Sequence, residues 1–431
     1  MTDRLSHPVL IRGGRLLDPE TGVERDGDLF IAGGRIARCP EVLPDHTEVI
    51  DAAGFHVAPG FIDLHVHLRE PGGERAETIA TGAAAAARGG FTTIVAMPNT
   101  QPPIDAPERV AFVMEQGRKA DQARVLTSAC LTQGRAGREI APLAELAAAG
   151  AVAFTDDGCT VQDDRVMRVA MNRAAELGLP VMDHAQDREM ELRGGAMHEG
   201  RRARELGIPG IPAEAETRIV ERDVQLAGET GCALHIQHVS CGESVPLIRA
   251  AQQRGLRVTA EATPHHLMFC EDDVDPARPD QYKMNPPLRT AEDRDQLKKA
   301  VGEGILTVLA TDHAPHPMAE KARSFVEAPF GVVGLETAVG VTYTLLVQSG
   351  VLTRMDWLRA WTTCPACLLN RQSPSLAVGQ PADIVVLDLD EEWTVDPAAF
   401  ASKGRNTPFG GMKWKGRAVV TLVDGRTRWA R

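Results

Sequence analysis

Four histidines and two aspartates are spaced along this chain in a way that suits metal binding: His65, His67, Asp157, His184, His238 and Asp312. Each follows a short apolar run that is typical of a β-strand. Because residues two apart in a strand point to the same side, the imidazoles of His65 and His67 can face one ion. Imidazole nitrogens and carboxylate oxygens suit one or two divalent cations, Zn²⁺ above all. The set therefore predicts a metal-assisted hydrolase.

The elements that must position these side chains alternate along the middle of the chain. Apolar runs typical of strands occupy residues 57–64, 91–97, 124–130, 151–154, 180–183, 232–239, 257–262 and 305–311. Stretches rich in Ala, Leu and Glu lie between them and predict helices. Two of these helices, Thr78–Arg88 and Glu139–Ala149, are followed by glycines, which commonly end helices.

Eight strand–helix units in succession predict an α/β fold of the (β/α)₈ TIM-barrel type. The active site of such a barrel lies at the carboxyl ends of its strands. All the candidate ligands follow a predicted strand and so fall at that end. The barrel and the metal site therefore support each other as predictions.

Short apolar runs broken by glycine turns occur near both ends of the chain, as at Asp28–Ile31 and Arg417–Val423. This pattern of short strands and turns predicts a small β-sandwich domain assembled from both termini. We expect that domain to comprise residues 1–57 and 378–431, and the catalytic barrel to comprise residues 58–377.

The composition of the chain disfavours two kinds of partner, nucleic acids and membranes. The formal net charge is −12 and the Lys and Arg residues are dispersed, which disfavours a nucleic-acid surface. No apolar stretch reaches the roughly 18 residues of a membrane span, and the first residues lack the pattern of a signal peptide. We therefore expect a cytoplasmic protein with reduced cysteines. The pair Cys364 and Cys367 fits core packing better than a redox or adventitious metal site.

The remaining histidines are expected to be ordinary core or surface side chains. His235 shares an apolar run with His238, but a spacing of three places the two on opposite faces of a strand. Either His265 or His266 could support the site from behind. His313 is expected to support the neighbouring aspartate by packing or hydrogen bonding.

Several short motifs are distributed along the chain, and the resemblance they carry covers nearly its whole length. They occupy residues 65–72 (HVHLREPG), 97–100 (MPNT), 154–158 (FTDDG), 182–184 (MDH), 238–240 (HVS), 285–289 (NPPLR) and 311–316 (TDHAPH). Together they resemble the class I dihydroorotases of the amidohydrolase superfamily. The HxH pair alone is typical of the whole superfamily, whereas the other motifs are far more specific.

The resemblance implies a zinc site with one or two ions per subunit. His65 and His67 would hold one ion, and His184 and His238 the other. Asp312 would ligate one ion and also act as the acid/base that transfers the proton.

A bridging carboxylate would complete this site. Dihydropyrimidinases, hydantoinases and allantoinases typically bridge the two ions with a carboxylated lysine, but this chain has no lysine between Lys119 and Lys283. Asp156 and Asp157 are both available as the bridging anion. The family spacing to His184 favours Asp157 and leaves Asp156 in a supporting position.

The resemblance also implies a substrate with a free carboxylate, N-carbamoyl-L-aspartate or its cyclic form L-dihydroorotate. Arg69, Asn99 and His316 would bind that carboxylate, and an arginine suits two parallel hydrogen bonds. The plainer alternatives are an ion pair between Arg69 and Glu70 and a turn or helix cap at Asn99.

The cyclic amide of the substrate would have its own partners. The side-chain amide of Asn285 can complement the ring amide, and backbone groups at Phe330 and Gly331 would line the ring. The segment 312–330 has no clear secondary structure in the sequence, so we expect it to be mobile without substrate.

The implied reaction is a reversible ring closure in pyrimidine biosynthesis, with Asp312 moving the proton between water and the ring nitrogen. Another cyclic amidohydrolase, such as a hydantoinase or allantoinase, is an alternative against which Arg69 and the missing lysine count. A non-catalytic partner of aspartate transcarbamoylase is a second alternative, against which the complete ligand set counts. An active enzyme could also bind aspartate transcarbamoylase, and we expect a homodimer.

Overall fold

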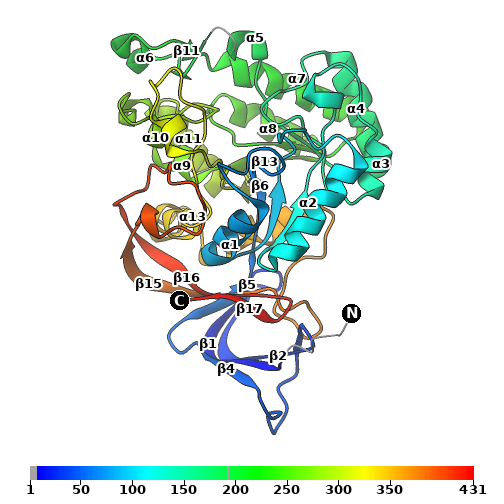
Figure 1. Cartoon of the computed structure of the whole chain (residues 1–431), viewed down its shortest axis with the longest axis vertical. Helices are drawn as coiled ribbons and strands as arrows, with labels where there is room; N and C mark the ends of the chain where they lie inside the picture. Colours follow the sequence, from blue (N-terminus) through cyan, green and yellow to red (C-terminus); the bar gives the residue numbers. More distant parts are fainter. Residues whose placement is uncertain (1–6, 192–193) are drawn as a thin grey trace.

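The computed structural model describes residues 7–191 and 194–431, which form a mixed α/β fold (Figure 1). Helices surround the strands of the upper part in Figure 1, and a twisted sheet forms the lower part. The mixed α/β class predicted from the sequence is confirmed. Among the described residues, no helix has the length and apolar character that crossing a membrane requires.

The lower part is one sheet in which strands from both ends of the chain pair with each other. Its strands run in the order β17-β16-β15-β5-β1-β2-β3, and β4 pairs with β1. Their bounds are β1 (Val9–Asp18), β2 (Val23–Ala32), β3 (Arg35–Ala37), β4 (Glu48–Asp51), β5 (His56–Pro59), β15 (Ile384–Thr394), β16 (Lys413–Val423) and β17 (Arg426–Ala430). The antiparallel pairing of β5 with β15, at Val57 opposite Val386, joins the two ends.

The strands of the upper part are parallel and short. They are β6 (Phe61–Val66), β7 (Phe91–Ala96), β8 (Arg124–Thr127), β9 (Val181–Asp183), β12 (Leu234–Ile236), β13 (Val258–Ala262) and β14 (Val308–Leu309). Every residue of β6 and β7 is buried, because parallel strands covered on both faces carry no solvent side. The strand predicted at 151–154 is reduced to single bridges at Phe154, one to Ala129 and one to Val181.

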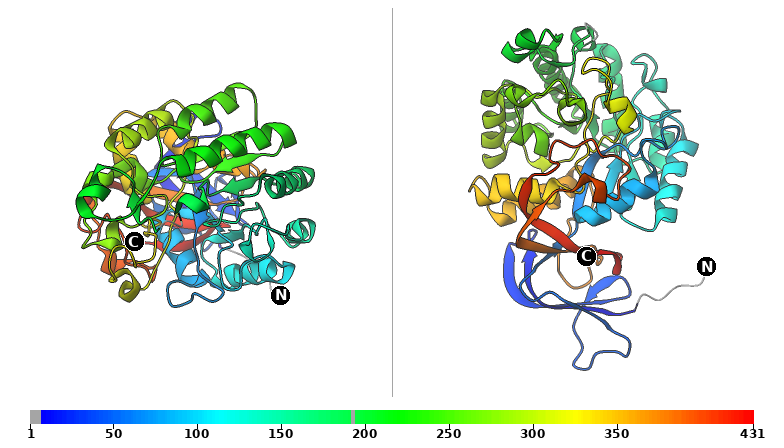
Figure 2. Two further views of the ribbon diagram at one scale, coloured as in Figure 1. Left: turned by 90° about the horizontal axis from the view of Figure 1, so that it is seen from above. Right: turned by 60° about the vertical axis from the view of Figure 1, so that its left-hand side comes forward.

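The parallel pairings of the upper part return to their starting strand. They lead from β6 through β7 and β8, across Phe154 to β9, and on through β12, β13 and β14. A bridge between His313 and Val66 then reaches β6 again. The view from above in Figure 2 shows the helices arranged around these strands.

The longer helices of the upper part are α1 (Ile79–Gly89), α2 (Pro107–Ala120), α3 (Leu143–Ala148), α4 (Asp164–Leu177), α7 (Glu214–Thr230), α8 (Ser244–Gln253), α11 (Ala291–Gly302), α14 (Arg354–Trp361) and α15 (Thr363–Leu368). As predicted, α1 ends at a glycine: Gly90 adopts φ 92°, and Thr78 caps the start of the helix by accepting from the Thr81 amide. The helix predicted over 139–149 begins only after Pro142, because Ile140 pairs with Thr132 in a bridge.

Short elements fill the loops above the strands. They are α5 (Arg188–Glu191), β10 (Met197–His198), α6 (Arg201–Leu206), β11 (Gly210–Ile211), α9 (Pro264–Met268), α10 (Pro279–Tyr282), α12 (Met318–Lys321) and α13 (Ala338–Thr342). Helix α12 corrects the sequence expectation that 312–330 lacks secondary structure. A π-helical stretch follows at Tyr343–Gln348, and 3₁₀ turns lie at Gln133–Arg135, Glu271–Asp273 and Pro397–Ala399.

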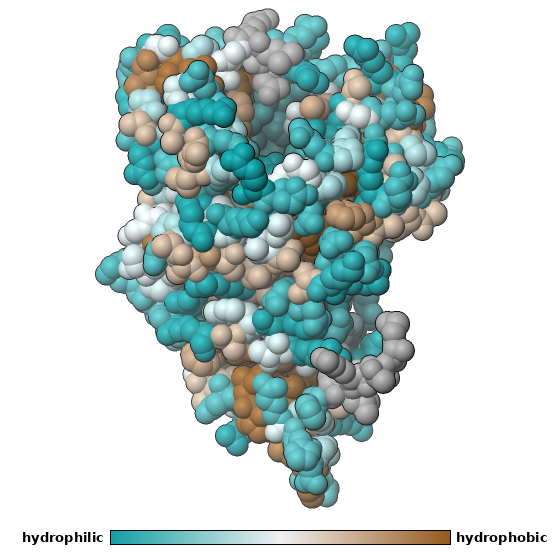
Figure 3. Space-filling view, viewed as in Figure 1, coloured by the Kyte–Doolittle hydropathy of each residue, from teal (hydrophilic) through white to brown (hydrophobic). Residues whose placement is uncertain are grey.

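The face seen in Figure 3 is largely hydrophilic, with an apolar area on the β-rich lower part. The large apolar side chains exposed in the N-terminal strands and their loops are Val23, Val42, Leu43 and Val49. Single exposed apolar residues of this kind are normal on a folded protein.

Candidate active site

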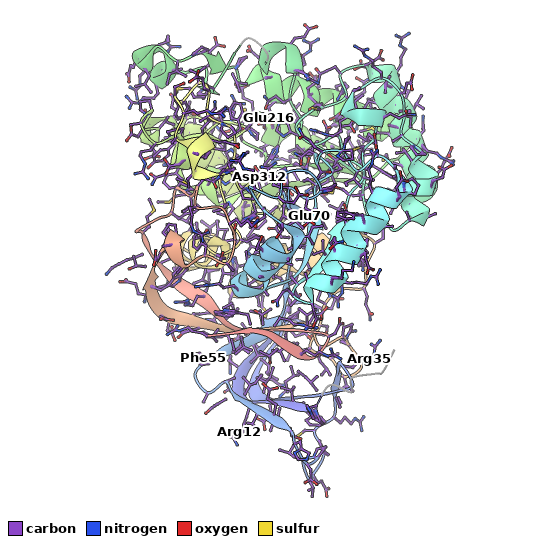
Figure 4. The ribbon with its side chains drawn as sticks, viewed as in Figure 1. Arg12, Arg35, Phe55, Glu70, Glu216 and Asp312 are labelled. Carbon is purple, nitrogen blue, oxygen red and sulfur yellow. The ribbon has the colours of Figure 1, made fainter. Side chains whose placement is uncertain are left out.

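The predicted metal ligands converge at the carboxyl ends of the parallel strands. The strands and the turns directly after them supply His65, His67, Asp157, His184, His238 and Asp312, all buried. Figure 4 shows Asp312 in the upper part, far from Arg12 and Phe55 of the sheet below. The structure therefore brings together residues that lie far apart in the sequence.

Asp157 lies between the imidazoles. Its Oδ1 is 3.4 Å from His65 Nε2 and 3.9 Å from His184 Nδ1. Its Oδ2 is 3.9 Å from His67 Nε2. Because its two oxygens face histidines from different strands, this carboxylate has the position of a bridging ligand.

Asp312 closes the site from the opposite side. Its Oδ1 lies 2.9 Å from His67 Nε2 and 3.4 Å from His65 Nε2. Donor atoms of His65, His67 and Asp312 lie within 4.8 Å of one another, as do those of His65, Asp157 and His238. The ring of His184 packs edge-on against that of His238, with centroids 4.5 Å apart.

The donor set fits a divalent cation. His65 Nε2, Asp157 Oδ1 and His238 Nδ1 are buried and have no hydrogen-bond partner within residues 7–191 and 194–431. Buried polar atoms without partners are rare in proteins, and these three belong to one cluster of potential ligand atoms. A bound cation would give all three a partner.

The protonation states of two members of the cluster, Asp157 and His238, favour ligation. Burial by itself would raise the pKa of Asp157, but the adjacent imidazoles of His65, His67 and His184 hold that pKa well below its usual range. Burial lowers the pKa of His238 well below its usual value, and the adjacent His184 and His65 add to the effect. An ionised carboxylate and a neutral imidazole are the forms that bind metal.

Several residues of the site have a left-handed backbone, which is uncommon for residues other than glycine. The φ angles are 59° at Arg69, 29° at His238 and 47° at Asp312. Such conformations persist only where the surroundings hold them, and they cluster at functional sites. Asp63 helps to hold the backbone of the site, because its Oδ1 accepts hydrogen bonds from the amides of both His65 and Thr311.

A buried carboxylate that the sequence analysis missed lies beneath the imidazoles. Glu261 in β13 accepts from His65 Nδ1 at 2.8 Å and from His235 Nε2 at 2.9 Å. His235 Nδ1 lies 2.8 Å from the hydroxyl of Thr259. Burial by itself would raise the pKa of Glu261, but His65 and His235 lower it to about 2. The ionised Glu261 accepts the proton on His65 Nδ1, which leaves Nε2 as the ring nitrogen of His65 that faces the metal cluster.

The sequence contained one signal for this support. Glu261 is the one charged residue of β13 (Val258–Ala262), where an acidic side chain is costly to bury unless it is paired. His235 is not a predicted ligand, and it serves the site from the interior through its bond to Glu261.

Asn99 and Asp156 have clear positions around the bridging carboxylate. Asn99 Oδ1 lies 3.0 Å from His67 Nδ1, and its Nδ2 donates to Asp157 Oδ2 at 2.8 Å. Asn99 therefore orients two of the predicted ligands. Asp156 Oδ1 instead accepts from the amides of Leu131 and Thr132, which turns it towards the neighbouring loop.

A cavity of about 230 Å³ opens above the metal cluster. It is lined by His67, Arg69, Asn99, Arg135, Asp157, Gly158, His184, His238, Asn285, Asp312, Ala314, Phe330 and Gly331. His65 lies beneath it, and His316 contacts its wall. Of these lining residues, Arg135, Gly158 and Ala314 were not identified as site residues from the sequence.

Two of the predicted substrate-binding residues, Arg69 and His316, meet at one wall of this cavity. Arg69 donates from Nε to the carbonyl of Pro315 at 3.2 Å, and its Nη2 lies 3.3 Å from His316 Nε2. The alternative partner Glu70 turns away and accepts from the amide of Ile79 at the start of α1. Burial lowers the pKa of His316 to about 2, and the charge of Arg69 adds to the effect. A neutral His316 leaves Arg69 as the principal cation on this wall.

The other walls carry Asn285 and Arg135. Asn285 Nδ2 lies 3.3 Å from His184 Nε2, which puts its amide beside the metal cluster. Arg135 donates to the carbonyl of Asp157 and adds a second guanidinium to the cavity. No pattern in the sequence pointed to Arg135, because it lies in a loop turn of left-handed backbone with φ 55°.

The other histidines and the cysteine pair have structural environments. His266 Nε2 lies 3.0 Å from the carbonyl of Pro286, next to Asn285. His313 Nε2 lies 3.4 Å from the buried Glu77. Cys364 is half-buried and Cys367 is exposed, and both are free thiols, so core packing does not account for Cys367.

Fold and site together define a class of protein. Over 98% of this chain and 96% of the other, the structure matches L-hydantoinase from Arthrobacter aurescens with a TM-score of 0.84 and 27% sequence identity. It matches D-hydantoinase from Bacillus sp. AR9, also with a TM-score of 0.84, at 26% identity over 98% and 95% of the two chains. The protein is a cyclic amidohydrolase.

Sequence relatives narrow this class. Residues 54–244 match the Dihydro-orotase-like family model. Dihydroorotase of Geobacillus kaustophilus is 48% identical over 94% of this chain and 96% of its own length. Dihydroorotase of Anoxybacillus flavithermus is 46% identical over 96% and 97%. The chain belongs to the dihydroorotase family.

Proposed function

We propose that this protein is a zinc-dependent dihydroorotase, which interconverts N-carbamoyl-L-aspartate and L-dihydroorotate in pyrimidine biosynthesis. The observation that carries the proposal is the convergence of the six predicted metal ligands, all buried, beside one cavity that Arg69 also lines. The family membership and the dihydroorotase names of the relatives support it. A scaffold that had lost catalysis would have no reason to keep every ligand.

In this proposal, His65 and His67 would hold one ion, His184 and His238 would hold the other, and the carboxylate of Asp157 would serve both. The donor set of imidazoles and carboxylates suits Zn²⁺. When bound, such ions polarise a carbonyl and lower the pKa of a coordinated water. Asp157 would supply the bridge for which hydantoinases and dihydropyrimidinases typically use a carboxylated lysine, so the chain would need no modified residue.

Asp312 moves the proton. Its carboxylate lies beside His65 and His67, where it can accept a proton from the attacking water and deliver it to the leaving ring nitrogen. In the direction of ring closure, it takes the proton from the carbamoyl nitrogen and returns it to the departing water. Asp312 lines the cavity, and its backbone is left-handed.

Arg69, Asn99 and His316 bind the substrate carboxylate, and Asn285 with the backbone at Phe330 and Gly331 binds the ring. A carboxylate distinguishes this substrate from hydantoin, allantoin and dihydrouracil, which have none. Burial strengthens such a charge-assisted contact. Arg69 is thus the side chain on which the choice of substrate depends.

We also propose that residues 58–377 form a (β/α)₈ barrel and that residues 1–57 and 378–431 form a β-sandwich domain. The run of parallel pairings that returns to β6 supports the barrel. The sheet shared by both ends of the chain supports the second domain. A cytoplasmic location, a homodimer and aspartate transcarbamoylase as a partner stay predictions from the sequence.

The test is hydrolysis of dihydroorotate by purified, zinc-reconstituted protein, with hydantoin, allantoin and dihydrouracil run in parallel. Turnover confined to dihydroorotate is expected. Turnover of hydantoin or allantoin with none of dihydroorotate would assign the protein to another branch of cyclic amidohydrolases. Absence of any turnover would favour a non-catalytic partner of aspartate transcarbamoylase.

A further inference from the structure

A lysine that forms no salt bridge with any carboxylate of residues 7–191 and 194–431 is buried behind the wall of the active site. Lys321, at the end of α12, has a relative exposure of 0%. Its Nζ donates to three backbone carbonyls, those of Lys283 at 3.0 Å, Pro329 at 2.9 Å and Gly331 at 2.9 Å. Burying a lysine in this way is costly, so its retention calls for a reason.

The three carbonyls belong to two separate segments that both contact the cavity. Pro329 and Gly331 flank Phe330, and Lys283 lies two residues before Asn285. The amide of Gly331 also donates to the carbonyl of Lys283 at 2.9 Å. Lys321 therefore fixes the separation between the Asn285 wall and the Phe330–Gly331 wall.

Neighbouring side chains strengthen the same junction. Lys283 Nζ donates to the carbonyl of Val326 at 2.8 Å and lies 4.6 Å from the centre of the Phe330 ring. Asn406, which is fully buried, donates to the carbonyls of Ala314 and Gly331, each at 3.0 Å. The junction thus has donors from two directions, and of these three side chains Lys321 is the one that bonds carbonyls of both walls.

The junction also explains why Gly331 is a glycine. Its φ is 130°, and a Cβ at this position would lie 2.6 Å from the Cβ of Ala314 and 2.9 Å from its carbonyl oxygen. The backbone of residues 329–331 therefore packs directly against the segment that carries the predicted catalytic Asp312. A small displacement of this backbone changes the shape of the substrate cavity.

We propose that Lys321 is a positioning residue that preassembles the substrate-binding walls, by holding the backbone of residues 329–331 against that of residues 283–285. The inference rests on the proposed function, because it assigns these walls to the substrate ring. Burial lowers the pKa of Lys321 to about 7, and the charge of Lys283 adds to the effect; a neutral amine retains two donors for the same carbonyls. Motion expected between 312 and 330 then falls on the exposed residues 322–324 and 326–327, and not on 329–331.

The test compares Lys321→Met with Lys299→Met, which alters an exposed lysine of α11. Methionine has a similar length and no donor, so three carbonyls lose a hydrogen bond. For Lys321→Met we expect KM to rise about tenfold or more in both directions of the reaction, since small misplacements of binding groups have effects of this order. We expect kcat and zinc content to stay close to the wild-type values, and Lys299→Met to match the wild type.

Hydrogen exchange of the substrate-free proteins supplies a second readout. The amide of Gly331 is expected to be protected in the wild type and to exchange faster in Lys321→Met, with the helices of the upper part unchanged. Unchanged KM and unchanged exchange at Gly331 in Lys321→Met would overturn the inference. So would faster exchange throughout the chain, which would assign Lys321 a general role in stability.

The wild-type measurement keeps the inference testable if Lys321→Met does not fold. Rapid exchange of the Gly331 amide in the substrate-free wild type would then contradict a preassembled wall. Failure of the proposed function would give a different result. The wild type would not turn over dihydroorotate, but its Gly331 amide would still be protected from exchange.

Discussion

Replacing Glu261 with glutamine isolates the charge that lies beneath the metal-binding imidazoles. The carboxylate bonds His65 Nδ1 at 2.8 Å and His235 Nε2 at 2.9 Å, and all three side chains are fully buried. Glutamine has nearly the same shape. Its amide can accept from His65 and donate to His235, whose ring then changes tautomer and donates to Thr259. The hydrogen bonds are thereby kept and only the negative charge is lost.

The expected loss is in zinc affinity. Removing a carboxylate that orients a ligating histidine typically weakens metal binding about 10- to 100-fold, or about 1.4 to 2.7 kcal/mol. We expect Glu261→Gln near the lower value, because His65 keeps an acceptor. We expect Glu261→Leu near the upper value, because a buried imidazole N–H then has no partner.

The assay is competition for Zn²⁺ between the apo-protein and a chromogenic chelator at neutral pH, with circular dichroism to verify folding. Glu336→Gln is the matched control, since Glu336 is also buried but bonds the amides of Ala401 and Ser402. Wild-type zinc affinity in both Glu261 variants would refute the reasoning. An equal loss in Glu336→Gln would show that any buried charge has this effect.

Three further predictions concern catalysis, substrate choice and stability. Asp312→Asn should lower kcat by about a thousandfold while binding of dihydroorotate stays measurable, and wild-type turnover would exclude its acid/base role. Arg69→Met should weaken binding of dihydroorotate by about 2 to 3 kcal/mol and leave dihydrouracil, which has no carboxylate, little affected; equal losses would disprove the carboxylate contact. Burial raises the pKa of Glu336 from 4.5 to about 7 although Arg88 lies 3.2 Å away. The pKa of Glu336 is higher in the folded than in the unfolded state, so ionisation of this group lowers the free energy of unfolding. As pH rises from about 4.5 to about 7, the wild type should lose up to about 3 kcal/mol of unfolding free energy relative to Glu336→Gln. Urea unfolding of both proteins across this pH range measures the difference in their free energies of unfolding. A difference that does not change with pH would contradict the prediction.

The sequence determined the predicted ligands and the kind of elements that carry them. His65 and His67 follow from the alternation of side chains along a strand, which is a local property. The apolar runs before Asp157, His184 and Asp312 marked strand ends, because buried parallel strands show as continuous apolar segments. The ends of elements were less well determined, as at 151–154, where only the bridges of Phe154 remain.

The contacts that hold the predicted site residues in position depend on the tertiary structure alone. Glu261 meets His65 across 196 positions, and Asn406 meets Ala314 across 92. Arg135 reaches the cavity only because its loop folds over Asp157, and Lys321 becomes a buried donor only where two loops meet. Such pairings depend on how strands and loops are arranged in space, and no local periodicity records that arrangement. The sequence therefore specified which side chains could do the chemistry, and the tertiary structure decided what holds them in position.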